Sequence, residues 1–145
     1  MHKLRQLLIC LVVAAAATLV LPAAQAAATP GRGVSAETIF DVEVGTTHLV
    51  LRRITIQPGG STGWHYHPSV VRGVVEAGVL THYAPDCSVD GVDKPGTVIV
   101  ETAGPGYVHL GMNLGRKPVV LEVLYQAPVG EPLAVDMPNP GCPVQ

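Results

Sequence analysis

The sequence has few charged residues and very few aromatic residues. Charged residues make up 14% of its 145 residues and aromatic residues 4%. With a formal net charge of −2, the chain lacks the basic patch that would attract nucleic acid or an anionic membrane surface. Its length and the scarcity of large side chains suit one compact domain with a modest core. We therefore expect a single domain without a nucleic-acid partner.

One long apolar run lies at the amino terminus. It follows the basic head "MHKLRQ" and ends in the small residues "AQA" at positions 24–26. This order is typical of a secretory signal peptide cleaved after Ala26. A retained membrane anchor is the alternative, because the run is nearly long enough to span a bilayer, but Pro22 and the many alanines favour removal. We expect residues 1–26 to be a signal peptide, and the mature protein to be secreted, periplasmic or in the cell envelope, with no membrane attachment.

Cysteine is rare, and only Cys87 and Cys142 follow the predicted signal peptide. In an oxidising compartment an even pair far apart in the sequence indicates a disulfide. Two free thiols are the alternative. A bridge would hold the proline- and glycine-rich tail, residues 131–145, and would stabilise the fold by roughly 4 kcal/mol in the loop-entropy model.

No segment after the signal peptide has a sustained helical period. Short β-branched runs separated by glycine and proline are found instead, which is typical of an all-β sandwich or barrel. The expected strands are 38–44, 47–56, 70–77, 79–84, 97–101, 108–113 and 118–127. We expect a flexible leader over 27–37, a barrel over 38–130 and no second domain.

The stretch "GWHYHPSVVRGVVEAG", residues 63–78, places two histidines two residues apart. On an extended strand His65, His67 and Val71 face one side together with other apolar positions. The two imidazoles therefore face the interior. A third histidine, His109, lies on a later strand, and three imidazoles that converge inside a small barrel would make an open transition-metal site.

Two motifs resemble those of the cupin superfamily. The first cupin motif, PG-x5-HxH-x3,4-E-x6-G, is similar to Pro58-Gly59, His65, His67 and Gly78, with Val71 in the place of the glutamate. The second, G-x5-PxG-x2-H-x3-N, is similar to Gly106, His109 and Asn113, although Gly104 replaces the proline and Gly96 comes two residues early. The resemblance covers residues 38–127 and is to small single-domain cupins with a conserved barrel. It implies a double-stranded β-helix, or jelly-roll, barrel.

In the common cupin pattern three histidines and one glutamate bind the metal. The resemblance implies His65, His67 and His109 as ligands, but Val71 cannot bind a metal. Glu76 has the wrong parity and Glu122 faces away from the apolar side of its strand, so Glu101 is the one substitute that we keep open. A site of imidazoles alone would favour one divalent zinc, iron, copper or nickel ion over magnesium, calcium or manganese.

Several polar side chains are weaker candidates. His82 is either a general acid or base near the metal or a histidine at an edge or on the surface. Tyr83 and Tyr107 are candidates for the pocket wall, and Tyr107 shares the face of His109 if that segment is extended. The arginines that could anchor an anionic substrate are Arg52, Arg53 and Arg72.

The sequence leaves the function open, including whether the protein is an enzyme. One hypothesis is an exported cupin that binds a transition metal through three histidines and acts on a small molecule as an oxygenase, isomerase or lyase. The alternative is a metal-free module that binds a small ligand in the barrel mouth. A third hypothesis is an interaction or structural protein, because small cupins resemble a family that often forms homodimers.

Overall fold

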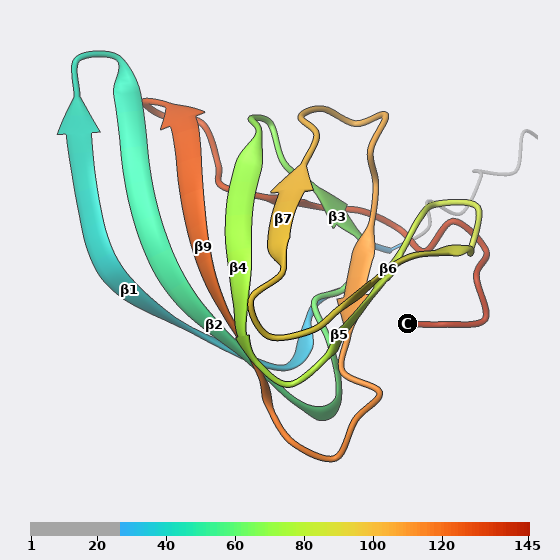
Figure 1. Cartoon of the computed structure of the whole chain (residues 1–145). Coiled ribbons are helices and arrows are strands. Elements are labelled where there is room, and N and C mark those ends of the chain that lie inside the picture. Colours follow the sequence, from blue (N-terminus) through green and yellow to red (C-terminus); the bar gives the residue numbers. More distant parts are fainter. Residues whose placement is uncertain (1–26) are drawn as a thin grey trace, which may run out of the picture.

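All regular structure in the described part of the chain is β-strand. The computed structural model describes residues 27–145 (Figure 1). The predicted signal peptide, residues 1–26, lies outside the described residues. Within residues 27–145 there is no helix of the length and hydropathy that a membrane crossing needs.

One antiparallel sheet of eight strands curls into an almost closed barrel (Figure 1). Its strands follow the order β6-β5-β8-β2-β9-β4-β7, and β1 pairs with the free side of β2. A two-stranded sheet of β3 and β10 lies beside it. The bounds are β1 Arg32–Val44, β2 Thr47–Ser61, β3 His65–Tyr66, β4 Val71–Ala77, β5 Leu80–Tyr83, β6 Val89–Asp93, β7 Val98–Glu101, β8 Leu110–Met112, β9 Val119–Pro128 and β10 Val135–Asp136. The predicted all-β jelly-roll barrel is confirmed.

The leader expected over 27–37 is wrong for most of its length. Strand β1 begins at Arg32 and pairs with β2 along its whole length, with Val34 opposite Ile56 and Ala36 opposite Ile54. The many small and polar residues of this segment hid the strand from sequence reasoning. Its backbone is ordered because β2 offers a long free edge, on which Val34 also packs against the main core.

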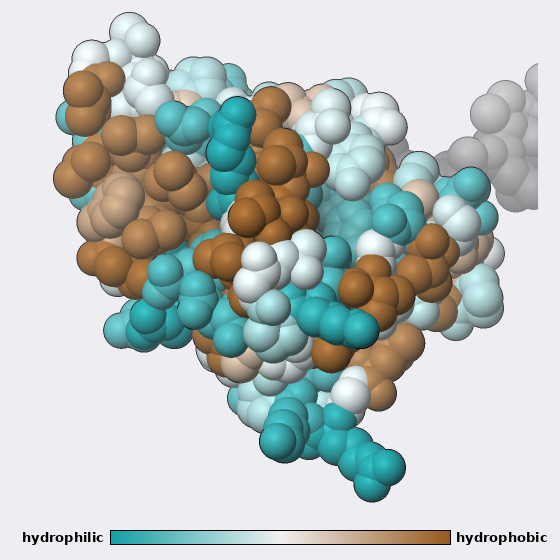
Figure 2. Space-filling view, viewed as in Figure 1, coloured by the Kyte–Doolittle hydropathy of each residue, from teal (hydrophilic) through white to brown (hydrophobic). Residues whose placement is uncertain are grey.

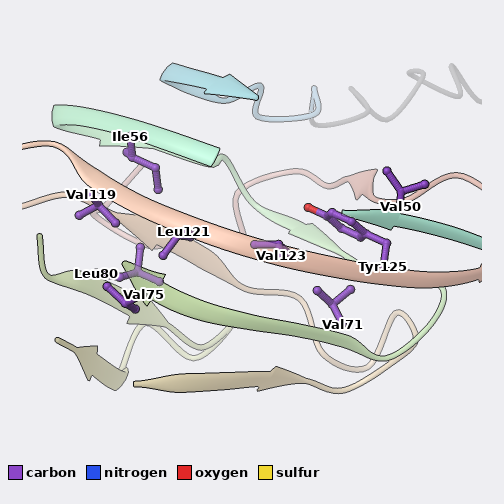
Figure 3. Close-up of a cluster of buried hydrophobic side chains, with 9 residues drawn as sticks. All are labelled: Val50, Ile56, Val71, Val75, Leu80, Val119, Leu121, Val123 and Tyr125. Atoms are coloured by element: carbon purple, nitrogen blue, oxygen red, sulfur yellow. The ribbon is translucent and has the colours of Figure 1, made fainter. Parts of the chain in front are cut away.

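The main core lies between the inner faces of β2, β4, β5 and β9. Figure 3 shows Val119, Leu121, Val123 and Tyr125 following one another along β9, as the alternation in the sequence predicts. The buried Val50 and Ile56 of β2 are the register partners of Tyr125 and Val119, and the buried Val71 and Val75 of β4 are those of Tyr125 and Leu121. This apolar packing fills the interior next to the histidines, and Leu80, Leu121, Val123 and Tyr125 of the core also line the cavity there.

Three kinds of contact attach the carboxy-terminal tail, residues 131–145, to the barrel: strand pairing, a backbone hydrogen bond and a disulfide. Strand β10 pairs with β3, Met137 N donates to the carbonyl of Trp64, and Cys142 forms a disulfide with Cys87. Trp64 is fully buried under this tail, and its indole Nε1 donates to Val144 O at 3.4 Å. The predicted disulfide is therefore present and connects the tail to the loop after β5.

Candidate metal centre

The three predicted histidines meet at one point inside the barrel. His65 and His109 are joined by a pair of backbone hydrogen bonds, His65 N to His109 O at 3.0 Å and His109 N to His65 O at 2.9 Å. The ring centroids lie 4.3 Å apart for His65 and His109, 4.9 Å for His65 and His67, and 5.2 Å for His67 and His109. One nitrogen from each ring lies within 4.8 Å of the others. The spacing suits three ligands of one ion.

Each of these imidazoles is oriented by a backbone carbonyl. The Nδ1 atom lies 2.9 Å from Gly63 O in His65, 2.7 Å from Leu133 O in His67 and 3.0 Å from Tyr107 O in His109. A carbonyl oxygen can only accept, so each Nδ1 must carry the proton. The Nε2 atoms are then left with their lone pairs free. Such outer partners fix the tautomer of metal-binding histidines.

The acid that Val71 lacks comes from the neighbouring strand. Glu101 ends β7 and is the register partner of Val71 in β4. Its carboxylate oxygens lie 2.9 Å from His67 Nε2 and 3.5 Å from His109 Nε2. The expectation of a site without an acid is therefore wrong, and Glu101, the substitute that the sequence kept open, lies at the histidines.

His82 joins the cluster as a fourth imidazole. It is 5% exposed, and its ring stacks on that of His109 at 4.9 Å. Its Nδ1 lies 2.5 Å from Asp90 Oδ1, and its Nε2 lies 3.8 Å from Glu101 Oε1. The interpretation of His82 as an edge or surface histidine is wrong. His82 shares the inner face of β5 with Leu80, and both side chains line the cavity.

Two ring nitrogens in this cluster are buried without a hydrogen bond, His82 Nε2 and His109 Nε2. The distance of 3.5 Å from His109 Nε2 to Glu101 is that of a charge contact, too long for a hydrogen bond of useful strength. Leaving a buried polar atom without a partner costs free energy. The residues therefore fit a metal ion, which would satisfy His109 Nε2 beside His65 and His67, whereas His82 Nε2 belongs to a second group with Glu101 and His109.

Burial and neighbouring groups determine the charge of His65 and of Glu101. Burial above all, with a smaller effect of the neighbouring His109, lowers the pKa of His65 to about 3, so this ring is neutral near neutral pH. Burial alone would raise the pKa of Glu101, but its contacts with His109 and His67 outweigh that effect and hold the pKa well below its usual range. Glu101 is therefore ionised.

A small cavity of about 50 Å³ opens at the cluster. Its polar wall consists of the four histidines and Glu101. Its other walls are mainly apolar, with Ile54, Leu80, Leu121 and Val123. Tyr125 closes one side, and its ring lies 5.7 Å from that of His67. The space accommodates a few water-sized groups beside the ring nitrogens.

The two tyrosine candidates lie in different places. The ring of Tyr107 is 5.1 Å from His109 and 6.2 Å from His82, and it lines a second cavity of about 190 Å³ between β6 and β7. His82 lines both cavities. Tyr83 does not reach the site, because it alternates with His82 on β5 and packs in a second apolar cluster with Trp64.

Comparisons with known proteins extend this picture. No protein-family model matches the sequence, and no curated protein matches it. Among solved structures, the polyketide cyclase RemF from Streptomyces resistomycificus is similar with a TM-score of 0.61 and 22% identity, over 74% of this chain and 74% of that one. A cupin-like protein from Thermotoga maritima has a TM-score of 0.61 and 19% identity, over 73% and 77%.

A recombinant oxalate oxidase in complex with glycolate is also similar, with a TM-score of 0.57 and 21% identity, over 71% of this chain and 54% of that one. Together with the barrel topology, these neighbours define the class: the chain has the cupin fold. The resemblance that the two histidine motifs indicate is confirmed at this level.

Sequence reasoning gave both His82 and Glu101 too little weight. A signal for His82 was present, since the alternation of Leu80, His82 and their neighbours marks the inner face of β5. The place of Glu101 depends on the register between β4 and β7, which sets Val71 opposite Glu101. No local spacing encodes that pairing.

Proposed function

We propose that the protein is a small exported cupin that binds one divalent transition metal ion through His65, His67, His109 and Glu101. The observation that carries the proposal is the fixed tautomer of the three rings, whose Nδ1 protons are held by carbonyls while one nitrogen of each ring lies within 4.8 Å of the others. The Nε2 atoms of His67 and His109 also face the carboxylate of Glu101. His82 offers a fourth imidazole nitrogen beside Glu101 and His109. Bound there, the ion would supply a Lewis acid or an oxygen-binding centre for a small molecule.

The carboxylate also bears on the choice of metal. Imidazole ligands suit zinc, iron, copper or nickel, and a carboxylate compensates part of the ion's charge. The sequence-based preference against manganese assumed a site without a carboxylate ligand. With Glu101 at the site, that argument no longer holds. The RemF and oxalate oxidase neighbours are named as enzymes, which supports an oxygenase, isomerase or lyase reaction over pure storage.

Export is part of the same proposal. The basic head and apolar run of residues 1–26 support it from the sequence. The Cys87–Cys142 disulfide fits an oxidising compartment, because such bonds are rare where thiols are kept reduced.

The alternative is a metal-free module that binds a small ligand. One contact favours it: His67 Nε2 and Glu101 Oε2, 2.9 Å apart, satisfy each other without an ion. Because the Nδ1 proton of His67 is already donated to Leu133 O, this contact needs a second proton on the pair. A metal ion would replace that proton.

Elemental analysis separates the two functions. The purified protein is equilibrated with zinc, iron(II), copper(II), nickel or manganese, and bound metal is counted per chain. We expect about one ion in the wild type, a loss in His65→Ala/His109→Ala and at least about tenfold weaker binding in Glu101→Gln, since removing a group that holds a metal site costs 10- to 100-fold even in the outer shell.

His48→Ala is the matched control, because His48 pairs with Asp41 outside the site and its loss should leave the metal content unchanged. Equal metal content in the wild type and the double variant would contradict the metal proposal. A melting temperature that ignores a chelator but rises with small organic ligands would support the alternative.

A further inference from the structure

Within residues 27–145, three buried side-chain atoms have no hydrogen-bond partner: His82 Nε2, His109 Nε2 and Arg52 Nε. The first two belong to the histidine cluster of the candidate metal centre. Arg52 is outside the proposed ligand set and needs its own explanation, because buried polar groups are nearly always paired.

Arg52 faces the inside of the barrel. Its neighbour Arg53 faces outward, where it bonds Glu122 at 2.6 Å. Alternation along β2 therefore places Arg52 on the inner face, between the buried Val50 and the cavity-lining Ile54. Its register partner across the sheet is Val123, which also lines the cavity.

Arg52 lies beside the wall of the candidate metal centre. Tyr125, which lines the cavity, is its diagonal neighbour on β9, since Val50 is the direct partner of Tyr125. Both side chains lie on the inner face, so Arg52 neighbours a residue whose ring lies 5.7 Å from that of His67.

Arg52 has no partner of its own among the described residues. Its neighbour Arg53 makes two ion pairs, whereas no carboxylate of the described chain lies within 4.0 Å of Arg52. Part of the side chain stays accessible although Nε is buried. An inward-facing cation without a counter-charge is unfavourable in the folded protein alone. A ligand that brings an anionic oxygen would remove the penalty.

We propose that Arg52 binds the carboxylate, or an equivalent anionic oxygen group, of a small organic acid whose reacting end lies at the candidate metal centre. The inference rests on the proposed function and names its substrate class. The planar guanidinium suits two parallel hydrogen bonds to a carboxylate. Ile54, Leu121 and Val123 line the apolar side of the cavity, and Ile54 and Val123 are the inward-facing neighbours of Arg52 along β2 and across to β9, so the ligand carries a short apolar body beside its anionic end.

Calorimetric titration of the zinc-loaded protein tests this inference, with isobutyrate as the probe and isobutyramide as its neutral match. We expect isobutyrate to bind the wild type and Arg53→Gln at least about tenfold more tightly than the amide, as for a charge-assisted pair. Arg52→Gln should lose that preference while it keeps zinc affinity and melting temperature. Arg52→Lys should keep part of the preference for isobutyrate, because lysine keeps the positive charge but lacks the planar guanidinium that makes two parallel hydrogen bonds.

A preference for isobutyrate that survives in Arg52→Gln would overturn the inference, and so would a wild type that binds no carboxylate at millimolar concentration. If the wild type binds none of the five metals tested above, the proposed function fails instead. The same titration of the metal-free protein then tests the role of Arg52. A preference for isobutyrate over isobutyramide that is lost in Arg52→Gln supports the role, and the lack of any such preference overturns it.

Discussion

Tyr125 shows how one buried residue links the site to the stability of the barrel. It is 7% exposed, and its ring lies beside His67. Burial first, and then the negative charge of Glu101, raise its pKa to about 12. The phenol of the folded protein therefore keeps its proton to a higher pH than a free tyrosine does.

We predict that stability falls between about pH 10, where the unfolded tyrosine ionises, and about pH 12, where the folded one does. In that window the unfolded chain has lost a proton that the folded chain keeps, so the free energy of unfolding falls by about 1.4 kcal/mol per pH unit, or about 3 kcal/mol in all. Denaturant unfolding at several pH values measures the slope. In Tyr125→Phe the free energy of unfolding should fall less steeply with pH, by the slope that one proton contributes. An equal slope in both proteins would contradict the prediction.

At the residue scale, the sequence predicts what depends on local spacing. The interval between His65 and His67 places both on one face, and the second motif identifies His109. Glu101 is different, because its position depends on pairing between strands that are far apart in the chain. Gly63 is an intermediate case. Its φ is +76°, and a Cβ at this position would lie 2.1 Å from Thr29 O, so only glycine fits, and its carbonyl orients His65.

At the scale of the element, β1 leaves an apolar surface exposed. Phe40, Val42 and Val44 are 40%, 46% and 61% exposed and lie on the outer face, since Phe40 pairs with Leu51 and Val42 with Leu49. Figure 2 shows hydrophobic surface over this part of β1 and β2. The other edge of β1 pairs with no strand of the described chain. Exposed edges and patches of this kind mark association surfaces.

We therefore predict that this face packs against a second copy of the chain. Phe40→Lys/Val42→Lys should shift the mass in solution from that of a dimer to that of a monomer. In a symmetric dimer the two new lysines of one copy would be buried near the same lysines of the other, which is unfavourable. Light scattering after size exclusion measures it. Leu114→Lys, an equally apolar and exposed position in the loop before β9, should remain dimeric. A monomeric wild type would contradict the prediction.

The elements that the sequence predicts best are those with clear alternation. Strand β9 covers 119–128 against a prediction of 118–127, and β4 covers 71–77 against 70–77. The prediction for β1 begins six residues late, and that for β2 ends five residues early. In both cases glycine, proline or serine extends a strand because the neighbouring edge supplies its hydrogen bonds.

At the scale of the whole molecule, the tail and the candidate metal centre are one unit. Leu133 O orients His67, and Asp136 in β10 pairs with His65. The disulfide of Cys142 with Cys87 holds the tail at its far end, across a sequence separation of 55. Loss of this bond would loosen the segment that orients two of the proposed ligands.

We predict that Cys87→Ser/Cys142→Ser lowers the free energy of unfolding by roughly 4 kcal/mol, as loop entropy implies, and weakens metal binding by about 10-fold or more, as expected when an orienting partner is lost. Thermal unfolding and metal titration measure the two effects, with Ser88→Ala as a control in the same loop. Unchanged metal affinity in a destabilised variant would show that the tail supports the fold alone.

The attachment of the tail has a consequence for the order of assembly. A chain still in synthesis lacks Leu133, β10 and Cys142, so the barrel strands can pair before His67 has its orienting carbonyl. The centre we propose would then become selective only after the bridge has closed. The ions present where oxidation takes place, rather than those present where the chain is made, would determine which metal the protein carries.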